Sequence, residues 1–322
     1  MVENVVPKVS VIIAVGVPGD YIRECIDHCL RLDYADFEII ALPDDPWAPP
    51  DPSVRVIPTG KVRPAEKRDR GVEEAKGEIV AIIDDDAYPE TDWLGNAVRH
   101  FEDPEVAAVG GPGMTPPGDG LLQCISGWIY ESPMVSGGYT YRYRPGSLRD
   151  VDDYPTSSLI MRREDFIAAG GFDTGYWPGE DTILCLKIVH ELRKRIVYDP
   201  SVRVYHHRRA IFGPHLRQIK SYALHRGFFA KRFPATSLKP QYFVPSVFAV
   251  FSLAGWGSWF VSGGLFAAWG MVMALYAALV LAFSLKTLNP VGIIGTFIGT
   301  FLTHIVYGLW FIKGLMSREL RD

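Results

Sequence analysis

The sequence has 322 residues, 48% of them hydrophobic and 22% charged, with a formal net charge of −4 at pH 7. The length permits two domains and the composition is globular on average. The charge is unevenly distributed, because residues 1–199 hold 35 acids but only 20 Lys and Arg, whereas residues 200–318 contain neither Asp nor Glu. Basic residues gather between 200 and 239, directly before an apolar region, and this favours anionic lipid head groups over nucleic acid as the partner.

The chain after residue 239 is apolar enough to enter a membrane. Residues 240–285 carry no charge and would form a helix of about 69 Å, against a hydrocarbon core of about 30 Å. We therefore expect two crossings, near 242–261 and 264–284. The stretch 291–312 also lacks charge and predicts a third crossing, with a re-entrant or interfacial helix as the alternative.

The orientation follows from the flanking cations. No secretory signal precedes the first strand, and Lys231, Arg232 and Lys239 flank the first span, so the positive-inside rule predicts a cytoplasmic N-terminal half. Three crossings would instead leave Lys313 and Arg318 outside, which weakens the third.

In chain order, short apolar segments alternate with helical patterns through the first 90 residues. Strands are expected over 9–15, 37–42, 54–57 and 79–83. Helices are expected over 21–32, where apolar residues recur at i, i+3 and i+4, and over 65–76. Such alternation predicts an α/β fold with a parallel sheet, of the kind that binds nucleotides.

The fourth of these strands stops abruptly at Asp84, Asp85 and Asp86. Three carboxylates at the end of a buried strand are unfavourable unless a cation lies there, and the carboxyl edge of a parallel sheet is where open α/β sheets bind ligands. A divalent cation with a phosphorylated substrate is the expected occupant. The alternative is an acidic turn whose side chains are solvated.

Several motifs recur in order and carry a family resemblance. They are the acids after 37–42, Lys67-Arg68-Asp69-Arg70, the stretch 77–89, Gly170-Gly171-Phe172-Asp173 and Gly179-Glu180-Asp181. Together, over about residues 8–232, they resemble the family 2 glycosyltransferases of GT-A (Rossmann-like) fold. The resemblance implies transfer of a sugar from a nucleotide-diphosphate donor with inversion at the anomeric carbon, assisted by Mg2+ or Mn2+. It leaves the oligomeric state undefined.

The resemblance also implies roles for the acids at residues 84–86. Asp84 and Asp86 match the first and third positions of the family's DxD motif, and two side chains two apart on an extended segment share a face, so both can bind one cation. Asp85 would point elsewhere, toward the nucleotide ribose. Asp44 and Asp45 lie where the family has an acid that recognises the nucleobase, and of the two we expect Asp44 to have this role.

The resemblance also implies roles for two pairs of charged residues and for one histidine. Lys67 and Arg68 match the pattern that contacts nucleotide or phosphate, with a solvated helix face as the alternative. Asp181 matches the general base, which accepts the acceptor's hydroxyl proton, and Glu180 would orient the acceptor or the base. An acidic pair favoured by the helix dipole is the alternative. His206 matches a third metal ligand, although His207 and a purely structural role are alternatives.

These expectations divide the chain into four parts. Residues 1–210 form the catalytic domain, 211–239 a basic amphipathic juxtamembrane segment, 240–313 the transmembrane region and 314–322 a short polar tail. Within the first part, 116–150 shows no clear period and is interpreted as a mobile acceptor-side or lid segment.

The expected protein is a membrane-anchored, inverting glycosyltransferase acting at the cytoplasmic face on a lipid-linked glycan. A polyprenyl-phosphate sugar synthase, a processive polysaccharide synthase and a non-catalytic binding module are the alternatives. The Gln-x-x-Arg-Trp signature usual in processive synthases is absent, because Gln218 is followed by Ile219-Lys220-Ser221.

Overall fold

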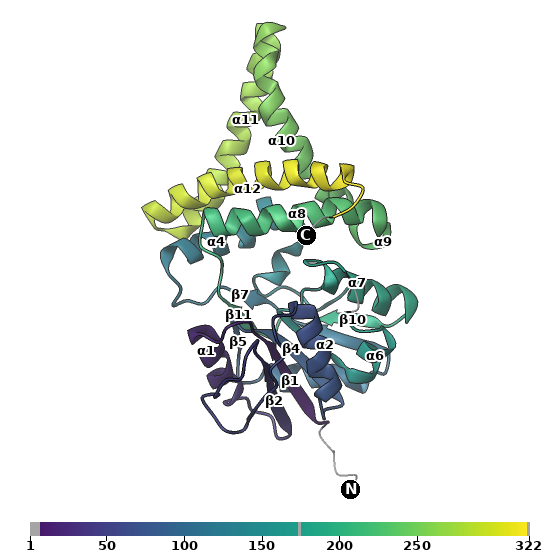
Figure 1. Ribbon diagram of the computed structural model, residues 1–322. Coiled ribbons are helices and arrows are strands. Elements are labelled where there is room, and N and C mark those ends of the chain that lie inside the picture. The colour runs from purple at the N-terminus through teal and green to yellow at the C-terminus, as the bar shows by residue number, and fades with distance from the viewer. Residues whose placement is uncertain (1–6, 173–174, 321–322) are drawn as a thin grey trace. The chain divides into compact units, whose positions relative to one another are not determined.

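The computed structural model describes residues 7–172 and 175–320. The chain folds as two compact units (Figure 1). One, the sheet unit, comprises the chain up to Pro116 together with Tyr141–His207, and the other, the helical unit, comprises Pro117–Thr140 together with the chain from Arg208 onward.

The sheet unit contains an eight-stranded sheet of order β3-β2-β1-β4-β9-β6-β10-β8. Its strands are β1 (Val9–Ala14), β2 (Phe37–Leu42), β3 (Val54–Val56), β4 (Ile79–Asp84), β6 (Val106–Gly110), β8 (Arg149–Val151), β9 (Ser158–Arg162) and β10 (Arg195–Tyr198). The expected first four strands are confirmed, and they pair in parallel. Ala14 lies opposite both Leu42 and Asp84, so β1, β2 and β4 end at one edge.

Beyond the four parallel strands that the sequence predicts, the sheet is mixed. Strand β9 runs antiparallel between β4 and β6, and β8 runs antiparallel to β10. The apolar pattern of β9 resembles that of a parallel strand because both of its faces are buried, so its direction is set by the chain path and not by its composition.

Helices cover the sheet, and small residues bring them close to it. They are α1 (Asp20–Cys29), α2 (Pro64–Glu74), α3 (Trp93–Val98), α6 (Arg163–Ala168) and α7 (Glu180–Leu186). Helix α1 buries Ile22, Cys25, Ile26 and Cys29, the face that the periodicity predicts. Helix α2 packs through Gly71, where a Cβ atom would lie 2.6 Å from the Ile12 side chain.

A second, three-stranded sheet of order β5-β11-β7 positions His206, one of the predicted site residues. Its strands are β5 (Ala87–Pro89), β7 (Gly113–Met114) and β11 (Val204–His206). Strand β11 pairs antiparallel with β5, with His206 opposite Ala87. This pairing places His206 next to the acids that follow β4, although more than a hundred residues separate them in sequence.

The helical unit consists of seven α-helices among the described residues. They are α4 (Leu121–Glu131), α5 (Pro133–Ser136), α8 (Gly213–Arg232), α9 (Pro234–Ser237), α10 (Val244–Ala254), α11 (Gly263–Ser284) and α12 (Pro290–Met316). By length and composition, 240–260, 263–287 and 290–316 are apolar enough to cross a membrane. Helix α8 lies within 211–239, the segment predicted to be basic and amphipathic.

Helix α4 is an element that the sequence did not predict. It lies in the tract 116–150, for which no regular structure was expected. Its apolar side chains pack on glycines of α12: a Cβ atom at Gly295 would lie 2.7 Å from Ile125, and one at Gly299 would lie 2.5 Å from Ile129. The helix therefore depends on tertiary packing with a segment distant in sequence, which a local pattern does not show.

Candidate active site

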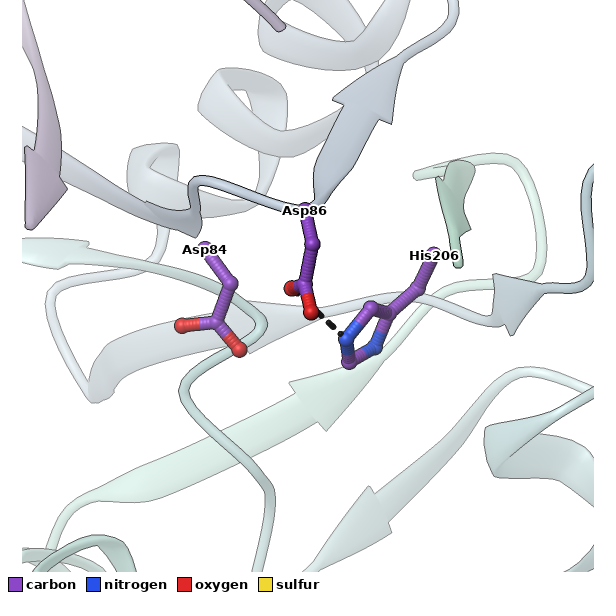
Figure 2. Close-up of side chains that lie close together, drawn as sticks. All are labelled: Asp84, Asp86 and His206. Carbon is purple, nitrogen blue, oxygen red and sulfur yellow. Dashed lines mark ion pairs between the residues drawn. The ribbon is translucent and has the colours of Figure 1, made fainter. Parts of the chain in front are cut away.

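Three potential metal ligands meet at the carboxyl edge of the sheet. Asp84 is the last residue of β4, Asp86 precedes β5 and His206 ends β11. One ligand atom from each lies within 4.8 Å of the others, and the His206 Nε2 atom is 3.1 Å from an Asp86 carboxylate oxygen (Figure 2). Their chemistry fits a divalent cation, because carboxylates suit Mg2+ and Mn2+ while the imidazole shifts the preference toward Mn2+ and other transition metals.

The two neighbouring histidines point to different partners. His206 belongs to the Asp84–Asp86 cluster, whereas the His207 Nε2 atom lies 2.9 Å from Glu24 and its ring stacks on Tyr21 with centroids 4.3 Å apart. The His207 backbone N–H also donates to the carbonyl oxygen of Asp86 at 2.9 Å. Of the two, His206 is therefore the one placed to bind a metal, and His207 anchors the segment that carries Asp86.

Arg68 connects this cluster to the second half of the predicted site. Its guanidinium donates to Asp84 at 2.7 Å and to Glu180 at 3.1 Å, and its side chain is only 8% exposed. Burial alone would lower the pKa of Arg68, but the charges of Asp84, Glu180 and Asp181 outweigh it and hold that pKa above its usual value. Arg68 therefore stays cationic and binds acids from β4 and α7 at the same time.

Glu180 and Asp181 begin helix α7. Asp181 is half-buried, and its carboxylate accepts a hydrogen bond from the Thr182 backbone N–H at 2.7 Å. Glu180 accepts from the Gly179 N–H at 2.9 Å in addition to its ion pair with Arg68. Both acids bond N–H groups at the helix start, as the helix-dipole alternative expects, but their electrostatic link to Arg68 is a feature that this alternative does not require.

Lys67 fixes the edge of the sheet where β2 ends. Its ammonium group, on a residue 2% exposed, donates to Asp44 at 2.7 Å and to the Thr59 hydroxyl at 2.8 Å. It also donates to the carbonyl oxygens of Leu42 and Gly60, both at 3.3 Å. The solvated-face alternative is therefore wrong for Lys67, and equally for the buried Arg68.

Asp85 and Asp69 have other described neighbours. The hydrogen bond with Cys29 and burial raise the pKa of Cys25 in α1, and the charges of Cys29, Asp85 and Asp84 add to this effect. Asp69 accepts a hydrogen bond at 2.9 Å from the backbone N–H of Phe172 in the glycine motif. Asp173, the last residue of that motif, lies outside the described residues.

Sequence reasoning did not find the double role of Arg68 or the support of His207 by Glu24. Arg68 lies on a helix that packs against the sheet, and a cation buried there must pair with acids. The sequence does not show which acids these are. Glu24 lies on an exposed part of α1, and nothing in its local pattern distinguishes it from the other surface acids.

Comparison with known proteins agrees with this geometry. The family described as Glycosyl transferase family 2 matches residues 10–167. This range includes Asp44, Lys67, Arg68 and the three acids after β4, but it ends before Asp181 and His206.

Two curated relatives are archaeal proteins. The glucosyl-dolichyl phosphate glucuronosyltransferase of Haloferax volcanii is 26% identical over 154 residues, which cover 43% of this chain and 46% of the relative. The dolichyl N-acetyl-alpha-D-glucosaminyl phosphate 3-beta-D-2,3-diacetamido-2,3-dideoxy-beta-D-glucuronosyltransferase of Methanococcus voltae is 24% identical over 246 residues, which cover 70% of this chain and 74% of the relative. The alignment thus spans less than half of the first relative's length.

A solved structure shares the fold over nearly the whole chain. The mannosyltransferase of Pyrobaculum calidifontis, solved in complex with GDP-mannose and Mn2+, aligns with a TM-score of 0.60 at 20% identity and covers 98% of this chain and 89% of that one. The strand order and this likeness show a GT-A fold. The match over residues 10–167, together with the relatives, supports assigning the chain to the family 2 glycosyltransferases.

Proposed function

We propose that this protein is an inverting glycosyltransferase that transfers a sugar from a nucleotide-diphosphate donor to a hydroxyl group of a lipid-linked glycan, at the cytoplasmic face of a membrane. The observation that carries the proposal is the bridge made by Arg68. It links Asp84, in the cluster suited to a cation, with Glu180, the neighbour of Asp181. Acids from two distant parts of the sequence thereby belong to one electrostatic unit.

The donor side of the site consists of Asp84, Asp86, His206, Lys67 and Asp44. A divalent cation held by the first three would neutralise the charge that develops on the departing nucleoside diphosphate. Lys67 holds Asp44 at the end of β2, in position to recognise the nucleoside. Arg68 contributes a buried positive charge beside the same edge of the sheet, which favours a phosphorylated donor.

The acceptor side depends on Asp181. We assign it the role of general base, which takes the proton from the attacking hydroxyl group as the oxygen bonds to the anomeric carbon. Its half-buried carboxylate is held in place by the Thr182 N–H. Glu180, which pairs with Arg68, would orient the acceptor or the base.

The nature of both substrates is proposed from the relatives. The Haloferax and Methanococcus proteins are named for transfer to sugars that already carry dolichyl phosphate, and the Pyrobaculum protein was solved with a nucleotide sugar and Mn2+. Three helices apolar enough to cross a membrane support an acceptor that is itself anchored in lipid. A lipid-linked glycan is the acceptor that suits both observations.

The test separates catalysis from donor binding. Asp181→Asn should lower transfer by at least about 100-fold, the usual contribution of a general base, while the affinity for the donor measured by titration calorimetry stays within about threefold. Glu191→Gln, which changes an exposed acid shortly after α7, is the matched control and should retain activity. Turnover retained in Asp181→Asn would reject the assignment and favour a polyprenyl-phosphate acceptor, whose oxygen needs little help from a base.

A further inference from the structure

Helix α12 is as long and apolar as a membrane span, but it packs differently from the other two candidate spans. In its most hydrophobic window 44% of the residues are buried inside the protein, against 17% for residues 240–260 and 6% for residues 263–287. Its mean hydropathy, 1.5, is close to that of the first candidate, 1.4. Hydropathy therefore does not separate α12 from the first candidate span, whereas its contacts separate it from both.

The contacts show that α12 runs alongside α8 in the same direction. At one end, the His215 Nε2 atom lies 3.0 Å from the Thr303 hydroxyl, and at the other, Lys231 donates to the Ser317 carbonyl oxygen at 2.6 Å. These contacts are separated by 16 residues of α8 and 14 of α12, or about 24 and 21 Å at 1.5 Å per residue. The two helices also lie side by side in Figure 1.

Glycines make this packing close where residues 224–227 of α8 meet residues 311–314 of α12. A Cβ atom at Gly227 would lie 2.1 Å from the Phe311 carbonyl oxygen, and one at Gly314 would lie 2.0 Å from the carbonyl oxygen of Leu224. The backbones therefore touch, and a change in the orientation of α12 relative to α8 would require both helices to separate.

Helix α8 is too strongly charged to cross a membrane. It carries five cations within 20 residues: Arg217, Lys220, Arg226, Lys231 and Arg232. A crossing would place several of them in the hydrocarbon core, which is highly unfavourable. Because α12 shares the direction of α8, it would have to share such a crossing, and α12 is therefore held out of the transmembrane orientation by its partner.

Helices α10 and α11 form a hairpin that contacts α12 at the start of α10 and then extends away from α8 and α12. In α10, Ser246 and Phe248, in the first turns, contact α12: the Ser246 hydroxyl donates to the Gly308 carbonyl oxygen at 3.0 Å, and Phe248 packs edge-on against Phe301. Further along, Ser252 bonds the sulfur of Met273 in α11. Figure 1 shows the two helices running together away from α12.

The exposed surface of α12 suits the boundary between head groups and acyl chains. Most of its exposed residues are apolar, namely Val291, Ile294, Ile298, Leu309 and Met316. Near its end, the ammonium groups of Lys220 and Lys313 lie 4.0 and 4.3 Å from the centre of the Trp310 ring. An indole flanked by two exposed cations is the arrangement expected at the head-group level of an anionic leaflet.

We propose that α8 and α12 together lie in the plane of the membrane, on the anionic lipid surface of the cytoplasmic leaflet, and that only the α10–α11 hairpin crosses the bilayer. Residues before 240 and after 285 then lie on one side of the membrane. Lys286, Lys313 and Arg318 join the other cations on that side, while the turn at 255–262 is uncharged. The conflict between a third crossing and the positive-inside rule disappears.

Cysteine labelling of the full-length protein in cells tests this topology. In a Cys124→Ser background, Ser258→Cys reports on the hairpin turn and Glu319→Cys on the end of the chain. A membrane-impermeant maleimide applied to intact cells should label Ser258→Cys and should label Glu319→Cys at least tenfold less. After permeabilisation, both should react. Labelling of Glu319→Cys in intact cells would show that α12 crosses, and protection of Ser258→Cys would show that the hairpin does not; either result overturns the proposal, whatever the enzyme's activity.

Discussion

Replacing Arg68 by Met is the most informative single change in the sheet unit, because it removes the cation that two site carboxylates share. Met preserves an apolar stem of similar length but leaves Asp84 and Glu180 without their counter-ion. Breaking a buried ion pair costs about 3–5 kcal/mol. Since the Glu180 side chain is 8% exposed but that of Asp84 is 25% exposed and partly solvated, we expect a loss near about 3 kcal/mol, at the lower end of that range.

The matched control lies two residues further along the same helix. Arg70 pairs with Glu73 at 3.5 Å and Glu74 at 3.3 Å, but its side chain is 54% exposed, so Arg70→Met should cost less than about 1 kcal/mol. In scanning fluorimetry of the full-length protein in detergent, a loss of 1 kcal/mol corresponds to about 2–4 °C. Arg68→Met should therefore lower the melting temperature by about 6–12 °C and Arg70→Met by less than about 4 °C.

Added Mn2+ provides an internal check on this reasoning. Arg68 competes with a cation for Asp84, so removing it should strengthen metal binding. Saturating Mn2+, at about 100 times its dissociation constant, stabilises by about 2.7 kcal/mol, and it should recover more of the melting temperature in Arg68→Met than it adds to the wild type. Equal losses of stability in the two arginine variants would refute the buried bridge.

Three further predictions concern the metal, pH and the membrane. His206→Ala should raise the Mn2+ concentration for half-maximal activity by about tenfold or more, while His207→Ala should raise it less; equal effects would contradict the placement of His206. Burial lowers the pKa of His215 from 6.5 to about 4, so the fold favours its neutral form and stability should fall as pH drops through this window. The stability of His215→Gln should fall less steeply over the same pH range, and an unchanged slope would assign it to other groups. Leu275→Lys, in the middle of α11, should reduce the fraction of the protein that stays in the membrane after alkali extraction, since a Lys at the centre of a span costs about 3 kcal/mol. Ile298→Lys on α12 should leave this fraction unchanged. Equal losses in the two variants would indicate that α12 also crosses.

The core of the sheet unit was predictable because its strands are continuous β-branched runs. The runs ending at Ala14, Leu42 and Asp84 have both faces buried, so their composition alone identifies them, and their common edge follows from parallel pairing. The direction of β9 did not follow, because the same composition fits either direction. Helix α4 was missed since its stability comes from contacts with α12, about 170 residues away.

The sequence was enough to predict which residues form the candidate site, but not which residues they bind. The positions of Asp84, Asp86 and His206 follow from motif and strand ends, and the structure brings them together. Lys67 and Arg68 were expected to contact the donor, but in the described structure they bind Asp44, Asp84 and Glu180, which the sequence cannot indicate because these pairs span 16 to 112 residues.

The stereochemistry of the reaction tests the proposed function most directly. Full-length protein should be incubated with Mn2+ and the nucleotide sugar that gives the fastest metal-dependent release of nucleoside diphosphate. The anomeric proton of the first sugar released to water should be followed by 1H NMR before mutarotation. With an α-linked donor, we predict that the β anomer is formed first in the wild type and that Asp181→Asn forms almost none. Initial formation of the α anomer would contradict an inverting transfer with Asp181 as the base.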